Sequence, residues 1–560
     1  MRFSCSTLIP LLGVLSATAD DSLSHKPVRQ VAIIGAGAAG SSTAYHLRKY
    51  AEQEGVAVNI TLFEKTAHIG GRSLTVDVYD DPRQPVELGA SIFVDVNHIL
   101  CNATEYFNLP VADPGTDEVG ILGIWNGEKF VFEQDSASSE WWNIAKLVWK
   151  YGTAPYYTRK LVRETVDSFL NLYQEPYFPF RSLTTRAYEL GLHKITGVTG
   201  KQFLEEKKLY GPFARDIVQT STRVNYASNL AYIHGLGTMV SMAAEGAMAV
   251  VGGNWQIFAH MVGFSGANVY LNTSVTSIAL TSSNEPNAPV SQYIIQTKDS
   301  ASPETQAVQQ DVQFDDVVIA TPYQFSDINH DESLILQPID KIPYATLHVT
   351  LFASPFRFSA EFFKLEPGIS VPISVLTTLG EDEEPRPGSE GAGKAGFYSA
   401  TLVKTAINPK TQRQENVYKI FSPDKVTPEF LSSLLGVQVP DTFIGHVDAE
   451  TREEFDVVEP VSWIHPTVFH PYPQKLPRVT FQDPILREGL YYTSGIESFI
   501  STMETSALSG MNVARLIVDD YLGLAAVQEK DNTSAILEDD QNQRVLGGHQ
   551  QQGATLVNDV

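Results

Sequence analysis

A glycine-rich turn close to the start of the chain constrains the fold more than any other feature. Residues 31–40 read Val-Ala-Ile-Ile-Gly-Ala-Gly-Ala-Ala-Gly, an apolar strand that runs into a Gly-x-Gly-x-x-Gly turn and then into a helical stretch. Such glycines allow a tight turn, let the backbone approach a pyrophosphate, and let the helix pack closely on the strand. A second apolar strand, 58–63, ends at Glu64, whose position suits an acid that binds a ribose hydroxyl. We therefore predict a nucleotide-binding βαβ unit whose phosphate-binding residues are Gly35, Ala36, Gly37, Ala39 and Gly40.

A second glycine turn follows Glu64 and indicates which dinucleotide is bound. The sequence continues with Lys65 and then with Gly70-Gly71-Arg72. This stretch resembles the extended flavin fingerprint of the amine oxidase and phytoene desaturase type of flavoproteins, in which the Gly-Gly-Arg turn lies beside the phosphates and ring of FAD. A glycine turn with one solvated arginine is the plainer interpretation, but it requires several ordered matches to be accidental. The resemblance implies FAD as the cofactor, with Lys65, Gly70, Gly71 and Arg72 among its binding residues.

The length and charge of the chain exclude several classes of protein. With 560 residues the chain exceeds the size at which one hydrophobic core stops growing, so at least two domains are expected. The formal net charge is −25, and no basic block is present that could neutralise a phosphate backbone. A nucleic-acid partner is therefore not expected. No metal site is predicted either.

The first residues have the pattern of a signal peptide. Arg2 precedes an apolar run from Leu8 to Leu15, and Ala17-Thr18-Ala19 supplies the small residues that a signal peptidase needs. We predict a signal peptide over 1–19 and no transmembrane segment, because no later stretch has about eighteen consecutive apolar residues. The mature chain is expected in the secretory pathway, either in a lysosome or vacuole or secreted from the cell.

The cysteines and the N-glycosylation sequons are consistent with the secretory pathway. Cys5 lies in the signal peptide, so Cys101 is the only thiol of the mature chain and an intramolecular disulfide is excluded. A lone buried thiol is the commoner role for such a residue, although a reactive thiol or a covalent flavin link stays open. Sequons for N-glycosylation occur at Asn59, Asn102, Asn272 and Asn532, of which Asn102 and Asn532 look the more accessible.

The distribution of strand and helix signals predicts an α/β protein with two interleaved domains. A Rossmann-like FAD-binding domain is assembled from the discontinuous segments 28–102, 245–322 and 486–524. An inserted α+β substrate-binding domain takes 103–244, with long helical stretches, and 323–485, with strands. The polar, glutamine-rich residues 525–560 are expected to be disordered. Val275, on a strand where the chain returns to the nucleotide domain, is included among the cofactor-binding residues.

A second glycine pattern, Gly391, Gly393 and Gly396, is rejected as a nucleotide site. It lies in 380–396, a stretch rich in Glu, Pro and Gly that cannot bury much and that we interpret as a mobile surface loop. No apolar strand leads into it, so the structural requirement of the motif is not met. Because no second site for a nicotinamide is found, the reduced flavin is expected to pass its electrons to oxygen.

The C-terminal region predicts a second contact with the cofactor. Residues 488–497 read as a strand, a glycine turn and an acid, and Met503 begins a long amphipathic helix. Flavoproteins of the type named above use such an element to hold the ribityl chain and to direct a helix N-terminus at the flavin pyrimidine, where partial positive charge stabilises the reduced ring. An ordinary strand and helix packed on the sheet is the alternative. Gly495, Glu497 and Met503 complete the predicted cofactor-binding set.

Several runs resemble one family more closely, the prenylcysteine oxidases, which are also called farnesylcysteine lyases. The most particular runs are Arg223-Val-Asn225-Tyr226 and the run from Gly495-Ile-Glu497 to Met503-Glu-Thr-Ser-Ala507, and the resemblance spans about 28–524. It implies an FAD-dependent thioether oxidase that cleaves prenyl-S-cysteine with O2 and water to a prenyl aldehyde, cysteine and hydrogen peroxide. An FAD-dependent amine or polyamine oxidase, or a catalytically inactive lipid carrier with a flavin fold, is the alternative.

The chemistry of a thioether oxidase leaves the catalytic residues unassigned, because hydride transfer from the carbon next to sulfur to flavin N5 needs no strong base. Three residues in a Pro-rich stretch before the C-terminal strand could face the substrate: His465, His470 and Tyr472. An ordinary loop histidine is the commoner case. Arg223 and Asn225 could bind the cysteine carboxylate or fix an interdomain turn. The aromatic helices from Trp141 to Leu172 could line an apolar slot or make a peripheral contact with a membrane, but an aromatic stripe at helical spacing is most often core.

Overall fold

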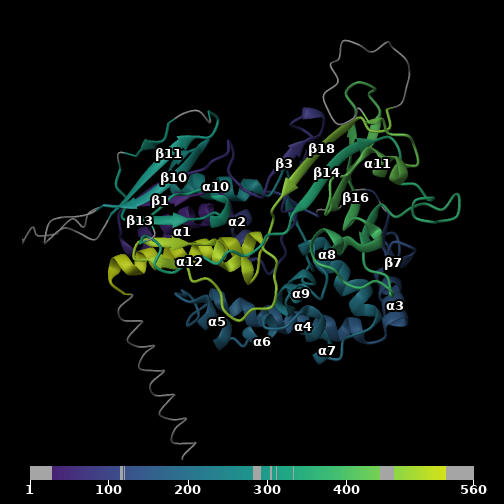
Figure 1. Cartoon of the computed structure of the whole chain (residues 1–560), viewed down its shortest axis with the longest axis horizontal. Helices are drawn as coiled ribbons and strands as arrows, with labels where there is room; N and C mark the ends of the chain where they lie inside the picture. The colour runs from purple at the N-terminus through teal and green to yellow at the C-terminus, as the bar shows by residue number, and fades with distance from the viewer. Residues whose placement is uncertain are drawn as a thin grey trace, which may run out of the picture.

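Two sheets, each packed against helices, organise the chain (Figure 1). The computed structural model describes residues 28–524 apart from 114–117, 119, 282–291, 303–305, 311, 332 and 442–458. The predicted signal peptide, the predicted disordered tail and the sequon at Asn532 lie outside the described residues.

The first sheet has six strands in the order β19–β20–β13–β1–β2–β9. β1 (Arg29–Ile34) pairs in parallel with β2 (Val58–Phe63) and with β13 (Asp316–Ile319). The outer strands are β9 (Asn268–Tyr270), β20 (Leu490–Tyr492) and β19 (Ile485–Arg487), of which only β19 is antiparallel to its neighbour. The carboxyl ends of β1, β2, β13 and β20 therefore lie at one edge, where open α/β sheets bind their ligands.

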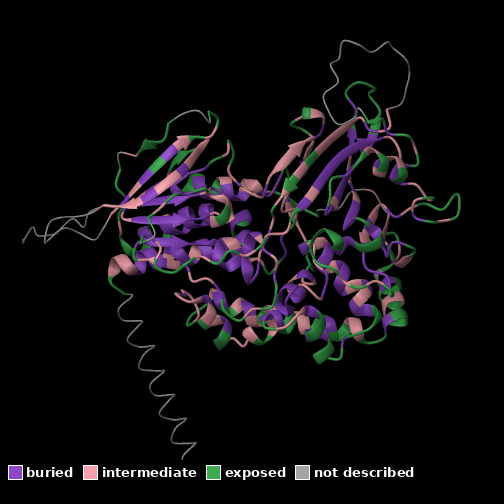
Figure 2. Ribbon diagram, viewed as in Figure 1, coloured by how far each residue is buried: buried purple, intermediate pink, exposed green. Residues whose placement is uncertain are grey.

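Both faces of this sheet are covered, as the near-continuous apolar sequence of β1 requires. Val31 and Ile33 share a core with α1 (Ala38–Glu54), α10 (Trp255–Ser265) and α12 (Met503–Leu522). The alternate residues Ala32 and Ile34 share a different core with β10 (Thr273–Leu280) and β11 (Tyr293–Asp299), which form a small sheet with β12 (Val308–Gln309). Figure 2 shows the central strands of this sheet and most of α12 buried, with half-buried residues at the C-terminal end of α12.

The second sheet has seven strands in the order β18–β14–β17–β16–β15–β6–β7. Five of them lie between β13 and β19 in the sequence: β14 (Leu347–Ser354), β15 (Ser374–Thr377), β16 (Ser399–Ile407), β17 (Gln414–Ser422) and β18 (Trp463–Phe469). The other two, β6 (Ile121–Trp125) and β7 (Phe130–Asp135), come from the first insertion, which the sequence analysis described by its helices alone. α11 (Pro428–Leu435) packs on one face of this sheet.

A layer of helices lies below both sheets in the view of Figure 1. It consists of α3 (Glu140–Tyr151), α4 (Ala154–Leu170), α5 (Leu183–Glu189), α6 (His193–Thr196), α7 (Gly200–Glu206), α8 (Gln219–Tyr226) and α9 (Gly235–Ser241). Short pieces join this layer to the nucleotide domain: α2 (His98–Tyr106), the hairpin of β3 (Thr75–Asp77) with β4 (Pro85–Glu87), and the pair β5 (Val111–Ala112) with β8 (Ala249–Val250). The boundaries predicted for the two domains stay predictions.

Candidate functional site

The two glycine turns predicted to bind phosphate lie against each other. Gly35 has a φ of +104°, and a Cβ on Gly40 would lie 1.9 Å from the Gly35 carbonyl oxygen. The Gly70 N–H donates a hydrogen bond of 2.9 Å to the Ala36 carbonyl. A Cβ on Gly71 would lie 3.0 Å from the Gly37 Cα. Only glycine allows this packing, and it leaves the backbone of both turns open to a close approach.

The N-terminus of α1 has the properties of a phosphate site. Its N-cap is Gly37, no side chain caps it, and the first turn contains no acidic residue. The free N–H groups and the positive end of the helix dipole therefore face the end of β1 without an internal partner of opposite charge. Ala39 lies in this first turn. The described residues thus fit the pyrophosphate of a dinucleotide.

Glu64 is buried beside this turn at the end of β2. One carboxylate oxygen accepts the Ala36 N–H at 2.8 Å, and the other accepts the N–H and hydroxyl of Thr66. The Thr273 N–H donates to the Glu64 carbonyl, which brings the start of β10 close to the acid. The side chain of Val275 is buried in the core, so only its backbone could contact a ligand, whereas Lys65 is exposed.

Arg72 and Glu497 join the second glycine turn to the C-terminal region. The guanidinium donates two hydrogen bonds to the carboxylate, at 2.7 and 2.9 Å, and a third to the Pro471 carbonyl. Burial opposes the charge of Arg72, but Glu497 raises the pKa of Arg72 above its ordinary value overall. The Tyr344 hydroxyl donates to the same carboxylate at 3.1 Å. Glu497 lies in a 3-10 turn, Ser494–Ser498, whose Gly495 packs against Gln482 with no room for a Cβ.

The C-terminal helix α12 begins at Met503, as predicted. Thr502 and Thr505 form its capping box, and the Ser73 hydroxyl donates to the Met503 sulfur at 3.0 Å. A Cβ on Gly510 would lie 2.2 Å from the Ala39 carbonyl, so α12 crosses α1 in close contact. The helix is therefore fixed against the phosphate turn, and its contact with a flavin pyrimidine stays a prediction.

The neighbouring acid, Glu504, has a structural role. It is buried, and it accepts the N–H groups of Ile99 and Leu100 at 2.9 and 3.0 Å and the Tyr173 hydroxyl at 2.9 Å. Burial raises the pKa of Glu504 to about 7, against the lowering effect of these donors. It thus caps α2 and is not available to a ligand.

Lys475 is a candidate that the sequence analysis missed. Its side chain is buried, and Nζ has no hydrogen-bond partner among the described residues. Nζ lies 4.1 Å from the ring centroid of Tyr226 and 5.1 Å from that of Tyr472. Burial lowers the pKa of Lys475 to about 7, with Glu497 opposing and Arg72 adding to the effect. Part of the Lys475 population is therefore uncharged near neutral pH and can accept a proton beside the Arg72–Glu497 pair, and Lys475 lines neither of the two cavities described below.

No local sequence signal identifies Lys475, because its setting depends on distant elements. Tyr226 ends α8, and its ring meets the Tyr472 ring edge to face at 5.3 Å. Of the three loop residues that sequence analysis placed near the substrate, the structure thus brings Tyr472 to this cluster. His465 lies within β18 beside Trp463, and His470 stacks on Phe325 at 5.2 Å.

The carboxylate-binding alternative for Arg223 is wrong. The side chain is buried, and its guanidinium donates to the carbonyls of Thr377, Gly391 and Ala392 and to the Asn229 side chain. Asn225 donates to the carbonyls of Ser221 and Ser241. Both residues therefore fix turns, which was the other interpretation.

The same contacts correct part of the prediction that 380–396 is a surface loop with little burial: residues 381–390 are exposed or half-buried, as predicted, whereas Gly391, Ala392 and Ala395 are buried. Residues Gly388–Ala395 form a 3-10 turn in which Gly391 and Ala392 are buried, since their carbonyls satisfy Arg223. No strand leads directly into this turn. Its contacts with Arg223 are structural and do not form a nucleotide site.

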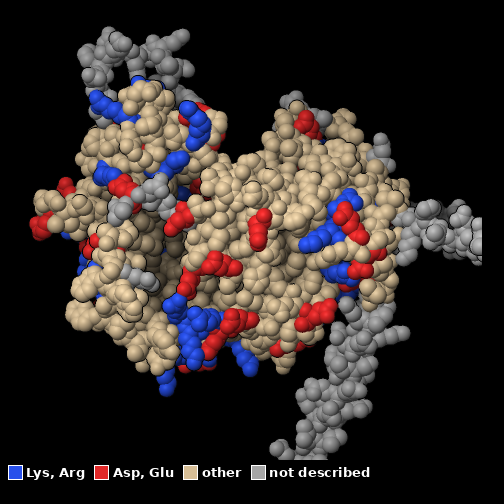
Figure 3. All heavy atoms as spheres, turned by 180° about the vertical axis from the view of Figure 1, so that it is seen from behind, with Lys and Arg blue, Asp and Glu red and all other residues tan. Residues whose placement is uncertain are grey.

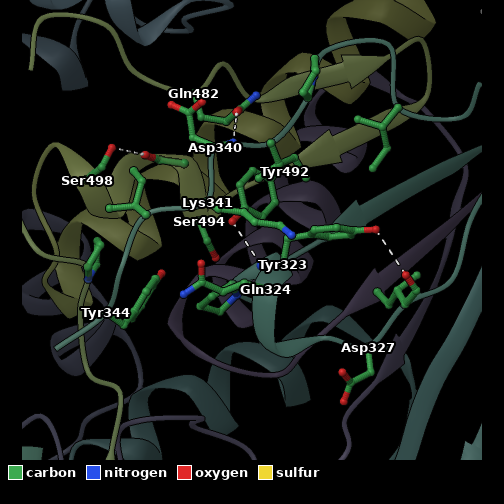
Figure 4. Close-up of a pocket in the computed structure, with 18 of the residues that line it drawn as sticks. Tyr323, Gln324, Asp327, Asp340, Lys341, Tyr344, Gln482, Tyr492, Ser494 and Ser498 are labelled. Carbon is green, nitrogen blue, oxygen red and sulfur yellow. Dashed lines mark hydrogen bonds between the residues drawn. The ribbon is translucent and has the colours of Figure 1, made fainter. Parts of the chain in front are cut away.

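Two cavities adjoin these residues. The larger, of about 580 Å³, lies at the carboxyl ends of β13 and β20 and includes Ser494 and Gly495 of the predicted cofactor turn (Figure 4). Most of its other walls come from residues 322–344, which supply apolar side chains together with polar ones such as Gln324, Asp327 and Lys341. The Tyr323 N–H donates to the Tyr492 hydroxyl at its edge. This size and position are typical of a ligand site in an α/β protein.

The smaller cavity, of about 300 Å³, lies between β4 and the strands β16 and β17. Glu87 has one oxygen bonded to the Asn254 N–H at 2.6 Å and one buried oxygen with no partner among the described residues. Lys419 donates to the Glu87 carbonyl at 2.8 Å and to the Ser91 hydroxyl at 2.9 Å. Burial raises the pKa of Glu87 to about 7 and lowers the pKa of Lys419 to about 8. The cavity therefore presents one carboxylate and one ammonium group.

This smaller cavity lies next to the second glycine turn. The Ala90 N–H donates to the Arg72 carbonyl at 3.2 Å, and a Cβ on Gly89 would lie 1.8 Å from the same oxygen. The wall that carries Glu87 and Ser91 is thus held against the backbone of the predicted flavin-binding turn. Residues Trp141–Leu172 line neither of these two cavities.

Cys101 is half-buried, and burial raises the pKa of its thiol to about 11, which disfavours a reactive thiolate. Of the sequons within the described residues, Asn102 is exposed, whereas Asn59 is half-buried and donates to the Gln30 side chain at 2.8 Å.

Comparison with known proteins decides the family. The family model described as prenylcysteine lyase matches residues 134–530, and a model of an NAD(P)-binding Rossmann-like domain matches 33–103. The chain belongs to the prenylcysteine lyase family. It is 26% identical to farnesylcysteine lyase of Arabidopsis thaliana, over 94% of this chain and 95% of that protein. It is also 26% identical to prenylcysteine oxidase 1 of Homo sapiens, over 90% of this chain and 92% of that protein.

Solved structures agree on the fold. Cyclohexylamine oxidase from Brevibacterium oxydans superimposes with a TM-score of 0.52 at 15% identity, over 88% of this chain and all of that chain. A redesigned putrescine oxidase superimposes with a TM-score of 0.51 at 13% identity, over the same shares. The mixed α/β fold with a Rossmann-like domain is thus confirmed. Fold and family together indicate FAD as the cofactor of an oxidoreductase, and the glycine cradle, the uncapped α1 and Glu64 fit it.

Proposed function

We propose that this member of the prenylcysteine lyase family is an FAD-dependent oxidase of prenyl thioethers. The observation that carries the proposal is that the family match covers most of the chain, while Arg72 and Glu497 close the cofactor cradle from segments 425 residues apart. The reaction consumes a prenyl-S-cysteine, O2 and water, and yields a prenyl aldehyde, cysteine and hydrogen peroxide. When bound, FAD supplies the two-electron acceptor and then returns the electrons to oxygen.

The chain's own residues hold the cofactor in place. The N–H groups at the start of α1 bind the pyrophosphate, and the spare lone pairs of the Glu64 carboxylate accept ribose hydroxyls. The Arg72–Glu497 pair locks the turn that follows to the end of the sheet. Buried pairs of this kind give little net stability but fix one geometry.

Lys475 handles the proton that the reaction releases. Water must add to the carbon that has lost a hydride, and its proton needs an acceptor close by. The unpaired Nζ of Lys475, with a pKa near 7, takes that proton and returns it to the departing cysteine sulfur. The rings of Tyr226 and Tyr472 keep bulk water from this amine.

The smaller cavity binds the amino-acid part of the substrate. A cysteine bound through sulfur retains an ammonium and a carboxylate, which are complementary to the free oxygen of Glu87 and the remaining N–H of Lys419. The side chains of Glu87 and Lys419 are buried and form no hydrogen bond with each other, which costs free energy when no substrate is bound. The zwitterion of the cysteine supplies a partner for each of them.

The location of the protein in the secretory pathway is also part of the proposal. The signal-like residues 1–19 and the exposed sequon at Asn102 support a secreted or lumenal glycoprotein, in a lysosome or vacuole or outside the cell. Digestion of the native protein with an endoglycosidase is expected to shift its mobility, and the shift should be smaller in Asn102→Gln.

The decisive assay compares thioethers with amines. Purified protein is incubated with S-farnesylcysteine, putrescine or spermidine, and hydrogen peroxide is measured. Peroxide from S-farnesylcysteine supports the proposal. Peroxide from the amines alone would identify an amine oxidase, and bound prenyl ligand without peroxide from any substrate would identify a carrier.

A further inference from the structure

The outward face of α3 is an exposed apolar surface. Trp141 is 82% exposed and Trp149 is 90% exposed, and Trp142 and Val148 on the same side are 59% and 53% exposed. The opposite side of the helix carries Tyr151, which is buried in the core beneath it. The helix is thus packed by one face, and its larger side chains point away from the protein.

This finding contradicts the interpretation of the aromatic stripe as core. Three exposed tryptophans within about two turns of helix are unusual on a protein surface, where single exposed apolar residues are normal and clusters mark interaction sites. The helical spacing was correct, but it does not tell which side of the helix faces the protein.

The next helix, α4, extends the same surface. Tyr156 is 68% exposed and Tyr157 is 53% exposed, and α3 and α4 are in contact. Lys160 and Arg163 follow Tyr156 at the spacing of one helical face, and both are exposed. We name the exposed set the α3–α4 face. It consists of Trp141, Trp142, Ile144, Val148, Trp149, Tyr156, Tyr157, Lys160 and Arg163.

The charge of this region is opposite to that of the chain. Residues 140–163 contain five basic residues and one acidic residue, whereas the whole chain has a net charge of −25. Figure 3 shows several basic side chains at the lower edge of the molecule, over the helical layer, with acidic side chains beside them. Three of the five pair with acids outside 140–163. Lys150 pairs with the buried Asp216. Arg159 pairs with Glu245 and Lys160 with Glu164, and such exposed pairs are weak in water.

We propose that the α3–α4 face docks on the surface of an anionic lipid bilayer. Tryptophan and tyrosine favour the boundary between headgroups and acyl chains, and lysine and arginine beside them are attracted to anionic headgroups. The negative charge of the rest of the chain is repelled by such a surface, so this face alone can approach it. No helix within the described residues could cross a membrane, which makes this an interfacial contact.

A second copy of the chain is a poorer occupant. A symmetric dimer through this face would bring the same basic residues together across the interface, and like charges at close range oppose association. The proposal does not depend on the thioether chemistry, because it rests on exposure and charge alone.

The test is co-sedimentation of the full-length holoenzyme with vesicles of phosphatidylcholine and phosphatidylserine, against vesicles of phosphatidylcholine alone. We expect binding to the anionic vesicles, a loss of binding as salt is raised, and a blue shift of tryptophan emission on binding. Two double variants test the apolar and the basic side chains of the α3–α4 face separately: Trp141→Ser with Trp149→Ser, and Lys160→Glu with Arg163→Glu. Each is expected to weaken binding about tenfold or more while peroxide production from soluble substrate is unchanged.

Matched controls change equally exposed residues elsewhere. Ile369→Ser alters an exposed apolar residue, and Lys410→Glu alters an exposed basic residue, and both should bind vesicles like the wild type. Equal binding to neutral and anionic vesicles, or unchanged binding by both face variants, would overturn the proposal. A wild type that ignores vesicles but forms a dimer that the tryptophan variants break would overturn it in favour of self-association.

Discussion

The cofactor side and the substrate side of the site are built in different ways. On the cofactor side, the backbone does the work: Gly35, Gly40 and Gly71 permit contacts that no side chain would allow, and α1 presents bare N–H groups. On the substrate side, buried side chains do it: Lys475 and the Glu87–Lys419 pair come from separate elements and retain unmet bonding capacity. A variant on the first side should therefore lose the cofactor, and one on the second should keep the cofactor and lose turnover.

The largest effect is expected from Gly40→Ala. Its Cβ would lie 1.9 Å from the Gly35 carbonyl oxygen, so the turn or the helix must shift. We expect loss of bound flavin, measured as visible absorbance per protein, together with a lower melting temperature. The control is Gly263→Ala in α10, where the added methyl meets nothing within 4 Å, and it should retain full flavin. A yellow, stable Gly40→Ala protein would contradict the role given to the turn.

Arg72→Met tests the pair that joins the two sides. It leaves the Glu497 carboxylate, whose side chain is 3% exposed, without its strongest partner. We expect a loss of about 2 kcal/mol in the free energy of unfolding, in the lower range for broken pairs because the Arg72 side chain is 36% exposed. Urea unfolding measures it. Arg83→Met, which removes an exposed pair with Asp81, should change the free energy by about 0.5 kcal/mol or less.

Lys475→Met should separate turnover from cofactor binding. Flavin content is expected to stay at the wild-type level while kcat falls about a hundredfold, as for loss of a general base. The wild-type rate should rise as pH passes through about 7, because the amine whose pKa burial has lowered becomes neutral and able to accept a proton. Lys475→Met should not show this rise of the rate in a pH series. Tyr226→Phe keeps the ring beside Nζ and should keep the rise of the rate with pH. If Lys475→Met and the wild type have the same pH profile, the assignment of Lys475 is refuted.

Lys419→Met is expected to act on substrate affinity. KM for S-farnesylcysteine should rise about tenfold, since a charged hydrogen bond to the carboxylate is lost. KM for S-farnesylcysteamine, which has no carboxylate, should not change. Lys410→Met is the control for a surface lysine. Equal losses with both thioethers would indicate that Lys419 only supports the wall of the cavity through Glu87 and Ser91.

The same contrast explains what the sequence could predict. β2 spans the predicted residues, α1 follows the glycine turn, and α12 begins at the predicted residue. The family resemblance predicted that the Gly70–Arg72 turn lies beside the FAD phosphates, and in the structure this turn contacts the Gly35–Gly40 turn. The glycine motifs are local sequence signals, although Gly35 packs against Ala320 and Gly70 against Trp255.

Lys475, Glu87 and Lys419 could not be predicted in this way. Each is an ordinary residue in its own segment, and its unusual state arises from burial by strands and helices far away in sequence. The same limit applies to α3, whose apolar spacing is identical for a helix that faces a core and for one that faces outward. Arg223 shows the reverse case, since a family-specific residue that suggested a ligand holds a turn.

The most direct test of the account is the visible spectrum of the purified protein under anaerobic conditions. We predict bound flavin that is bleached on addition of S-farnesylcysteine, recovers its colour with oxygen, and is unaffected by putrescine. A colourless protein after reconstitution with FAD, or flavin that only amines can bleach, would contradict it.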